Sequence, residues 1–94
     1  MYARVVRFTG VTPERIEAIR ARVQEQGGPP EGVPSTGMQL IYDASQETAV
    51  FVGYFASEED MRTGAEVLQQ MDSTDTPGTR ASVDAGEVAI EMDA

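Results

Sequence analysis

Two side chains near the N-terminus, Tyr2 and Arg4, carry groups that could bind a small polar ligand. The guanidinium of an arginine is a fixed fork of donors that could bind an anionic or enolate oxygen, and a phenol could donate one hydrogen bond. Each side chain also has an ordinary structural interpretation. Arg4 could pair with an acidic residue across a subunit interface, and Tyr2 could pack at the edge of a sheet. The sequence leaves both interpretations open.

The residue types that the chain lacks exclude several kinds of site. Its 94 residues include no His and no Cys, which excludes thiolate catalysis, disulfides and every Cys-based metal site. No side chain has an ordinary pKa near neutrality, so no Ser or Thr has a base partner that can be named. The adjacent Glu58 and Glu59 fall in the first turn of a predicted helix, where helix capping explains them. We expect no metal site.

The chain is strongly acidic, with 7 basic against 16 acidic residues and a formal net charge of −9. Nucleic acid and anionic membranes are poor partners for such a chain, because binding to phosphates depends on clustered basic residues. The simplest interpretation of the acidic composition is that it keeps the protein soluble. Arginines interrupt the N-terminal apolar run, and the longest apolar run, 49–56, is far shorter than the roughly 20 residues of a membrane helix. We expect a cytoplasmic protein.

Six segments predict one α+β domain that spans residues 1–94. Four strands are expected at 2–9, 37–43, 49–55 and 79–92, and a five-residue polar loop, 44–48, joins the middle two as a hairpin. A helix should begin after Thr12, with Pro13 at its first position, and end at the Gly-Gly-Pro-Pro run 27–30. A second helix should begin after Ser57, and its apolar stripe is formed by Met61, Ala65, Leu68 and Met71.

The order βαββαβ predicts a ferredoxin-like fold, in which two helices cover one face of a four-stranded antiparallel sheet. Both faces of the hairpin are apolar. We expect one face to consist of Met38, Leu40, Tyr42, Val50, Val52 and Tyr54, with the two tyrosines in the core, and the other to include Ile41, Ala49, Phe51 and Phe55. Because two helices cover only one face, the second apolar face predicts a homodimer with its sheets facing each other.

Four segments, 2–5, 32–34, 52–61 and 86–91, together resemble the dimeric α/β-barrel proteins of the antibiotic biosynthesis monooxygenase type. The resemblance covers nearly the whole chain, and it rests on the pattern of strands and on the junction between the third strand and the second helix. It implies a dimer whose two sheets enclose a barrel-like cavity. It does not by itself imply catalysis.

Relatives that oxidise polycyclic aromatic substrates without a metal or flavin often carry a Trp just before the second helix, where this chain has Phe55. Haem-degrading relatives use a His from the region of the second helix and an Asn on the first strand. This chain has neither residue type, which leaves Tyr as a conventional axial ligand and argues against ordinary haem degradation. We therefore expect no cofactor.

The resemblance also implies which side chains line the cavity, namely those that share the face of Phe55. The candidate ligand-binding residues are Tyr2, Arg4, Gln39, Phe51, Gly53 and Phe55. Gly53 could leave room for a ligand or mark a bulge, and the two phenylalanines could simply pack an interface.

Two functions remain open. The first is a cofactor-independent monooxygenase, in which a dry cavity holds a small aromatic or enolisable molecule while Arg4 and Tyr2 stabilise oxyanion charge. The alternative is a non-catalytic homodimer that binds a ligand or serves a structural role. The sequence does not decide whether the protein is an enzyme.

Overall fold

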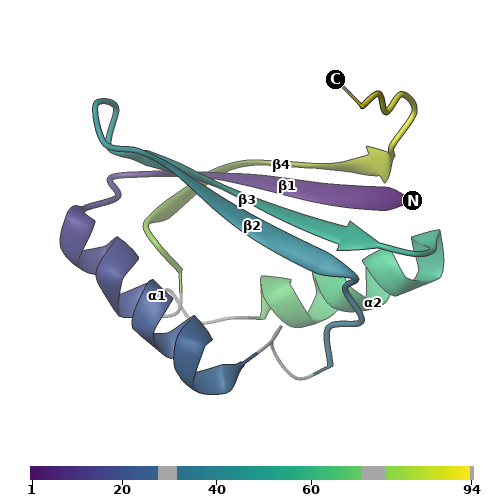
Figure 1. Ribbon diagram of the computed structural model, residues 1–94, viewed down its shortest axis with the longest axis horizontal. Helices are drawn as coiled ribbons and strands as arrows, with labels where there is room; N and C mark the ends of the chain where they lie inside the picture. The colour runs from purple at the N-terminus through teal and green to yellow at the C-terminus, as the bar shows by residue number, and fades with distance from the viewer. Residues whose placement is uncertain (28–31, 71–75, 94) are drawn as a thin grey trace.

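The computed structural model describes residues 1–27, 32–70 and 76–93, and its elements follow the expected order βαββαβ (Figure 1). The elements are β1 (Tyr2–Thr9), α1 (Pro13–Gln26), β2 (Gly37–Asp43), β3 (Thr48–Phe55), α2 (Glu58–Gln69) and β4 (Thr79–Glu87). The expected loop residues 28–31, the stripe residue Met71 and the breaker residues 72–75 lie outside the described residues.

The four strands form one antiparallel sheet in the order β2-β3-β1-β4. Figure 1 shows α1 and α2 on the same side of this sheet. The expected ferredoxin-like arrangement, with four antiparallel strands and two helices on one face, is therefore confirmed.

Both helices begin where the capping residues predict. The Thr12 side chain accepts a hydrogen bond from the Arg15 amide at 3.3 Å, and Pro13 occupies the first turn of α1. Ser57 accepts one from the Asp60 amide at 3.1 Å at the start of α2. These bonds satisfy backbone donors that the first turn of a helix otherwise leaves unpaired.

The register of the hairpin differs from the predicted one by a single residue. Asp43 pairs with Thr48, so the connecting loop has four residues, 44–47, and Thr48 already belongs to β3. The Asp43 carboxylate accepts hydrogen bonds from Ser45 and Gln46, and Glu47 takes a positive φ of 54°, which together close the shorter loop. A shift of one residue moves every side chain of a strand to the other face.

The corrected register changes the composition of both faces. The helix side of the hairpin consists of Met38, Leu40, Tyr42, Ala49, Phe51, Gly53 and Phe55. The prediction that placed Val50, Val52 and Tyr54 with Met38 and Leu40 is wrong. Tyr42 does lie on the helix side, packed against buried residues, whereas Tyr54 lies on the opposite side, and its expected core position is a second error.

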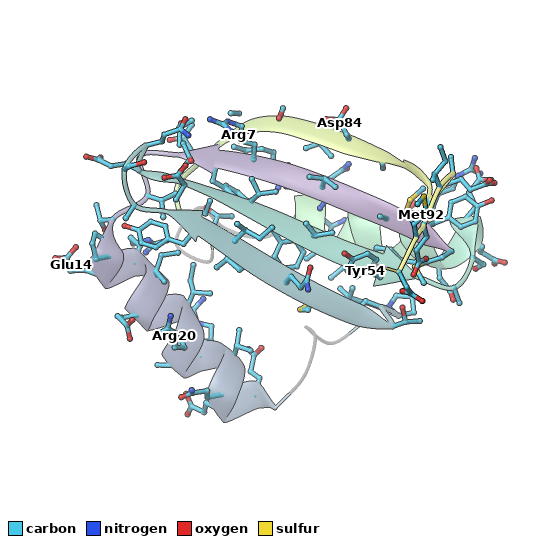
Figure 2. All side chains as sticks on the ribbon, turned by 45° about the horizontal axis from the view of Figure 1, so that its top comes forward. Arg7, Glu14, Arg20, Tyr54, Asp84 and Met92 are labelled. Atoms are coloured by element: carbon cyan, nitrogen blue, oxygen red, sulfur yellow. The ribbon has the colours of Figure 1, made fainter. Side chains whose placement is uncertain are left out.

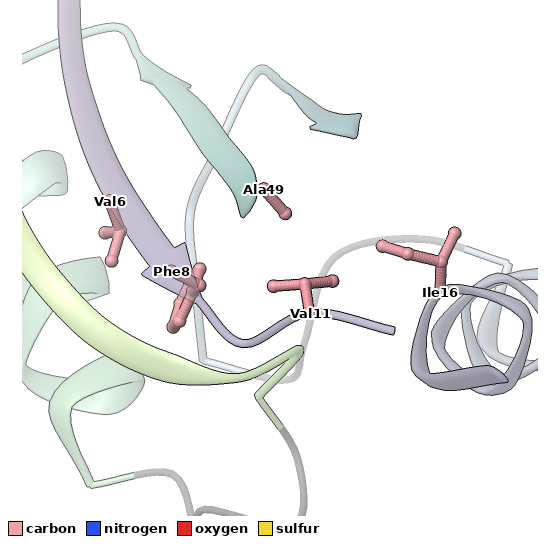
Figure 3. Close-up of a cluster of buried hydrophobic side chains, with 5 residues drawn as sticks. All are labelled: Val6, Phe8, Val11, Ile16 and Ala49. Carbon is pink, nitrogen blue, oxygen red and sulfur yellow. The ribbon is translucent and has the colours of Figure 1, made fainter. Parts of the chain in front are cut away.

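The core consists of two clusters of buried side chains on the helix side. The first joins β1 to the start of α1 through Val6, Phe8, Val11, Ile16 and Ala49 (Figure 3). The second lies under α2 and consists of Val33, Phe55 and Leu68. Phe55 is fully buried because α2 carries Gly64 above it, where a Cβ atom would lie 2.7 Å from the Phe55 ring.

We call the opposite side of the sheet the open face, because neither helix covers it. It is formed by Ala3, Val5, Arg7, Gln39, Ile41, Val50, Val52, Tyr54, Ser82 and Asp84. Figure 2 shows Arg7 and Asp84 on the side of the sheet away from the helices. Ile41 is 56% exposed, and the Tyr54 hydroxyl donates a hydrogen bond to Gln39 Oε1 at 3.4 Å. A single chain therefore leaves an apolar sheet surface uncovered, as expected for strands that carry apolar side chains on both faces.

The last strand is shorter than predicted. It ends at Glu87, opposite Tyr2, and the following amide, Val88, donates its hydrogen bond to the carbonyl of Met1. Because β1 offers no further partner, the expected continuation to residue 92 is wrong. Ile90 and Met92 are instead 83% and 84% exposed. Ile90 and Met92 alternate with acidic residues in the period of a strand. A strand also needs a second strand beside it that can exchange backbone hydrogen bonds.

Candidate functional site

A cavity of about 240 Å³ lies on the helix side of the sheet, beneath α1. This volume is slightly below the roughly 300 to 1,000 Å³ of typical small-molecule sites. We call it the α1 cavity. Its lining consists of Arg4, Val6, Phe8, Ile19, Arg22, Val23, Gln26, Met38, Leu40, Phe51, Leu68, Thr76, Pro77 and Arg80.

The cavity exists because α1 packs on the sheet mainly at its N-terminal end. Ile16 is buried in the first core cluster, but Ile19 is only half-buried and Val23 is 47% exposed, although all three belong to one apolar stripe. Correspondingly, α1 makes fewer contacts with the sheet than α2 does. The second half of the stripe therefore forms a wall of the cavity instead of closing onto the strands.

Arg4 enters this cavity from the centre of the sheet. It belongs to β1, pairs across the strands with Gly53 and Ala85, and is only 2% exposed. Its Nη2 atom is buried and has no hydrogen-bond partner among the described residues. Burial, and then the positive charge of Arg80, lower the pKa of Arg4 below its ordinary value. Both effects mean that the surrounding described residues stabilise the charged guanidinium poorly.

Arginine is concentrated at this site. Three of the seven basic residues, Arg4, Arg22 and Arg80, line the α1 cavity, and no Asp or Glu is among its described lining residues. Arg22 comes from α1, and Arg80 from β4, where it pairs with Phe8 across the strands. A chain with a net charge of −9 thus contains a cavity in which the charged side chains among the described lining residues are all positive.

The structure brings together some of the predicted site residues and separates others. Arg4 and Phe51 line the cavity. Tyr2, Gly53 and Phe55 lie on the same side of the sheet but belong to the packing beneath α2: a Cβ atom on Gly53 would lie 3.4 Å from the Phe55 ring. At that distance a Cβ atom would make only an ordinary contact, so this packing does not require a glycine at position 53.

Gln39 was expected on the face of Phe55, and that prediction is wrong. It pairs with Val52 and lies on the open face, beside the Tyr54 hydroxyl. The cause is again the one-residue shift of the hairpin, which leaves Gln39 on the open face and moves Phe51 and Phe55 to the helix side.

Sequence reasoning missed the residues that α1 and β4 contribute. On α1, Ile19, Arg22, Val23 and Gln26 follow the spacing i, i+3, i+4, i+7, which places all four on one helix face. That spacing was a usable signal for Arg22. No comparable signal existed for Arg80, because its position depends on how β4 pairs with β1.

No helix in the described part of the chain is long and apolar enough to cross a membrane. Within the same residues, no group of three or more His, Cys, Asp and Glu side chains could hold a metal ion.

Comparisons with known proteins give the fold and no closer relationship. No protein-family model matches the chain, and no curated protein matches it in sequence. Among solved structures, the chain is similar to a mutant of MhuD with two manganese protoporphyrin IX molecules bound per active site, with a TM-score of 0.66 and 15% identity over 100% of both chains. It is also similar to Rv0793 from Mycobacterium tuberculosis, with a TM-score of 0.58 and 17% identity over 98% of both chains.

At these identities the likeness is one of fold, and it extends over the whole of each chain. The strand order, the position of both helices on one side of the sheet and the two structural neighbours all indicate the same fold. The chain therefore has a ferredoxin-like α+β fold, and both solved structures are similar to it in fold.

Proposed function

We propose that the α1 cavity binds a small, mainly apolar aromatic molecule, and that two subunits associate through their open faces. The observation that supports the ligand site is the chemistry of the cavity wall. Val6, Phe8, Leu40 and Phe51 form an apolar floor, and Val23 faces it from α1. A concave, mainly apolar surface with a few convergent polar groups is the usual form of a small-molecule site.

The proposed ligand site lies inside one subunit, between its sheet and α1, and not between the sheets of two subunits. The resemblance implies an inter-sheet cavity lined by the face of Phe55, and that face is the helix side of the sheet. In the structure, Arg4 and Phe51 point to the helix side. Each face of the sheet then has one role: the helix side holds the ligand, and the open face meets the partner.

The proposed homodimer is supported by the composition of the open face. Val5, Val50, Val52 and Tyr54 are only partly buried there, and Ile41 is mostly exposed. A contiguous apolar sheet surface of this kind usually marks an interface. A second copy of the same face would cover it with matching shape, as in a two-fold symmetric dimer.

The ligand site can be tested with a neutral fluorophore, N-phenyl-1-naphthylamine, whose emission rises in an apolar environment. We expect saturable binding with one probe per subunit. Val23→Trp, which places a large ring in the cavity wall, should weaken binding at least ten-fold. Ala21→Trp is the matched control, because Ala21 is exposed on the other side of α1 and does not line the cavity. Equal binding by both variants would contradict the proposed location.

A haem-type ligand is suggested by the manganese protoporphyrin IX of the MhuD structure, but the residues of this chain do not fit a haem iron. Among the described lining residues there is no imidazole, thiolate or phenol. Met38 offers a thioether, which serves haem proteins as an axial ligand beside a His. We therefore assign no role to haem in this cavity.

Oxygenation without a cofactor is a second candidate function, and Arg4 is the observation that favours it. A buried guanidinium would stabilise the enolate of an enolisable aromatic substrate. In the reaction, a ring CH2 group becomes a carbonyl, one atom of O2 enters the product and the other leaves as water. Oxygen uptake with a panel of anthrone-like and quinol substrates tests this function. Uptake no greater than that of a boiled control would contradict it.

A further inference from the structure

The α1 cavity contains a positive charge that no acidic side chain among its described lining residues balances. Arg4 is 2% exposed, and its buried Nη2 atom makes no hydrogen bond to any described residue. Buried charged groups in proteins are normally paired and hydrogen-bonded, because removal of an ion from water is unfavourable otherwise. A guanidinium at the floor of a cavity, with a buried Nη2 atom that no described residue satisfies, is therefore a group that can take its partner from a ligand.

Arg4 shares the cavity with other positively charged side chains. Arg22 and Arg80 also line the cavity, and no acidic side chain does so among the described residues. The like charge of Arg80 already disfavours the charged form of Arg4. A negative group bound between these side chains would stabilise both of them at once. The rest of the cavity surface is mostly apolar, so only one end of a ligand can carry that group.

We infer that the ligand of the α1 cavity is an aromatic carboxylate, bound with its carboxylate on Arg4 and Arg80 and its ring against Val6, Leu40 and Phe51. This inference rests on the proposed ligand site and adds the chemical class of the ligand. The planar fork of a guanidinium matches the two oxygens of a carboxylate, which accept two parallel hydrogen bonds. The surrounding low dielectric makes that pair stronger than it would be in water.

A pair of nearly isosteric probes tests the inference: 2-naphthoate, which is an anion at neutral pH, and 2-naphthamide, which is neutral. We expect the wild-type protein to bind 2-naphthoate at least ten-fold more tightly than 2-naphthamide in isothermal titration. Arg4→Gln should remove that preference while 2-naphthamide and N-phenyl-1-naphthylamine still bind. Arg80→Gln, at an exposed position, should reduce the preference several-fold.

Arg7→Gln is the matched control, because Arg7 belongs to the same strand as Arg4 but lies exposed on the open face. It should keep the full preference. If the wild type binds N-phenyl-1-naphthylamine but shows no preference for 2-naphthoate, the inference is overturned and the proposed site stands. If 2-naphthoate, 2-naphthamide and N-phenyl-1-naphthylamine all fail to bind, the proposed ligand site itself is wrong. If Arg4→Gln does not fold, the Arg80→Gln and Arg7→Gln pair decides in the same way.

Discussion

Replacing Arg4 with Met should make the ligand-free protein more stable. The methionine keeps most of the apolar length of the arginine stem. It removes a side chain that is 2% exposed and whose buried Nη2 atom has no hydrogen-bond partner among the described residues. Replacement of buried charged groups with apolar residues of similar volume is often neutral or stabilising by up to about 4 kcal/mol. We expect an increase of about 1 to 3 kcal/mol in the free energy of unfolding, within that range.

Urea unfolding and thermal melting measure this change. In a domain of this size, each kcal/mol moves the melting temperature by about 4 to 8 °C. All variants should be compared at one subunit concentration, because association between subunits makes the apparent stability depend on concentration. Arg7→Met is the matched control. The Arg7 side chain is exposed on the open face, so its replacement should change the free energy of unfolding by less than about 0.5 kcal/mol.

Addition of 2-naphthoate should reverse the order of the variants. A ligand at 100 times its dissociation constant stabilises the folded state by about 2.7 kcal/mol. We expect that gain in the wild type and little of it in Arg4→Met, which lacks the cation. A loss of more than about 1 kcal/mol in ligand-free Arg4→Met would refute the reasoning, because it would show that Arg4 has a favourable partner in the folded protein.

Three further outcomes follow from the packing, the open face and the hairpin loop. Gly64→Ala should lower the free energy of unfolding by about 1 to 3 kcal/mol, because its Cβ would lie 2.7 Å from the Phe55 ring, whereas Gly86→Ala meets nothing within 4 Å and should be nearly neutral in urea unfolding. Ile41→Asp on the open face should convert a dimer to monomers in analytical ultracentrifugation; Val83→Asp, also exposed and apolar but on the helix side of β4, should not. The pKa of Asp43 is lowered, chiefly by the hydrogen bond from the Ser45 side chain and also by those from Gln46. Its contribution to stability is therefore complete above the unfolded pKa and disappears as pH falls through the folded value. Asp43→Asn should flatten the urea midpoint against pH in that acid range, and an unchanged acid limb would show that the loop bonds contribute nothing.

The elements of this fold could be predicted from local signals because each signal acts within a few residues. Thr12 and Pro13 fix the start of α1, and Ser57 fixes the start of α2, through bonds to their own first turns. The order of the elements then predicts a four-stranded antiparallel sheet with both helices on one face. These parts of the prediction needed no knowledge of distant contacts.

The faces of the hairpin could not be predicted in the same way. Whether Thr48 ends the loop or begins β3 depends on the pairing of Asp43 with Thr48, on the bonds at the Asp43 carboxylate and on the positive φ of Glu47. A strand with one polar face would have shown the error at once. Here both faces are apolar, so a shift by one residue leaves the pattern equally plausible.

The site was harder to predict than the fold because it depends on where packing stops. The apolar stripe of α1 indicates a helix that closes on the sheet along its length, yet only Ile16 is buried in the core, and Val23 stands over a cavity. That gap leaves Arg4, a buried residue of the sheet, in the lining of a cavity. The same strand carries Arg7 on the open face, where its side chain is exposed. Two arginines three residues apart thus have different surroundings, and the difference follows from the alternation of a strand combined with a helix that leaves part of one face uncovered.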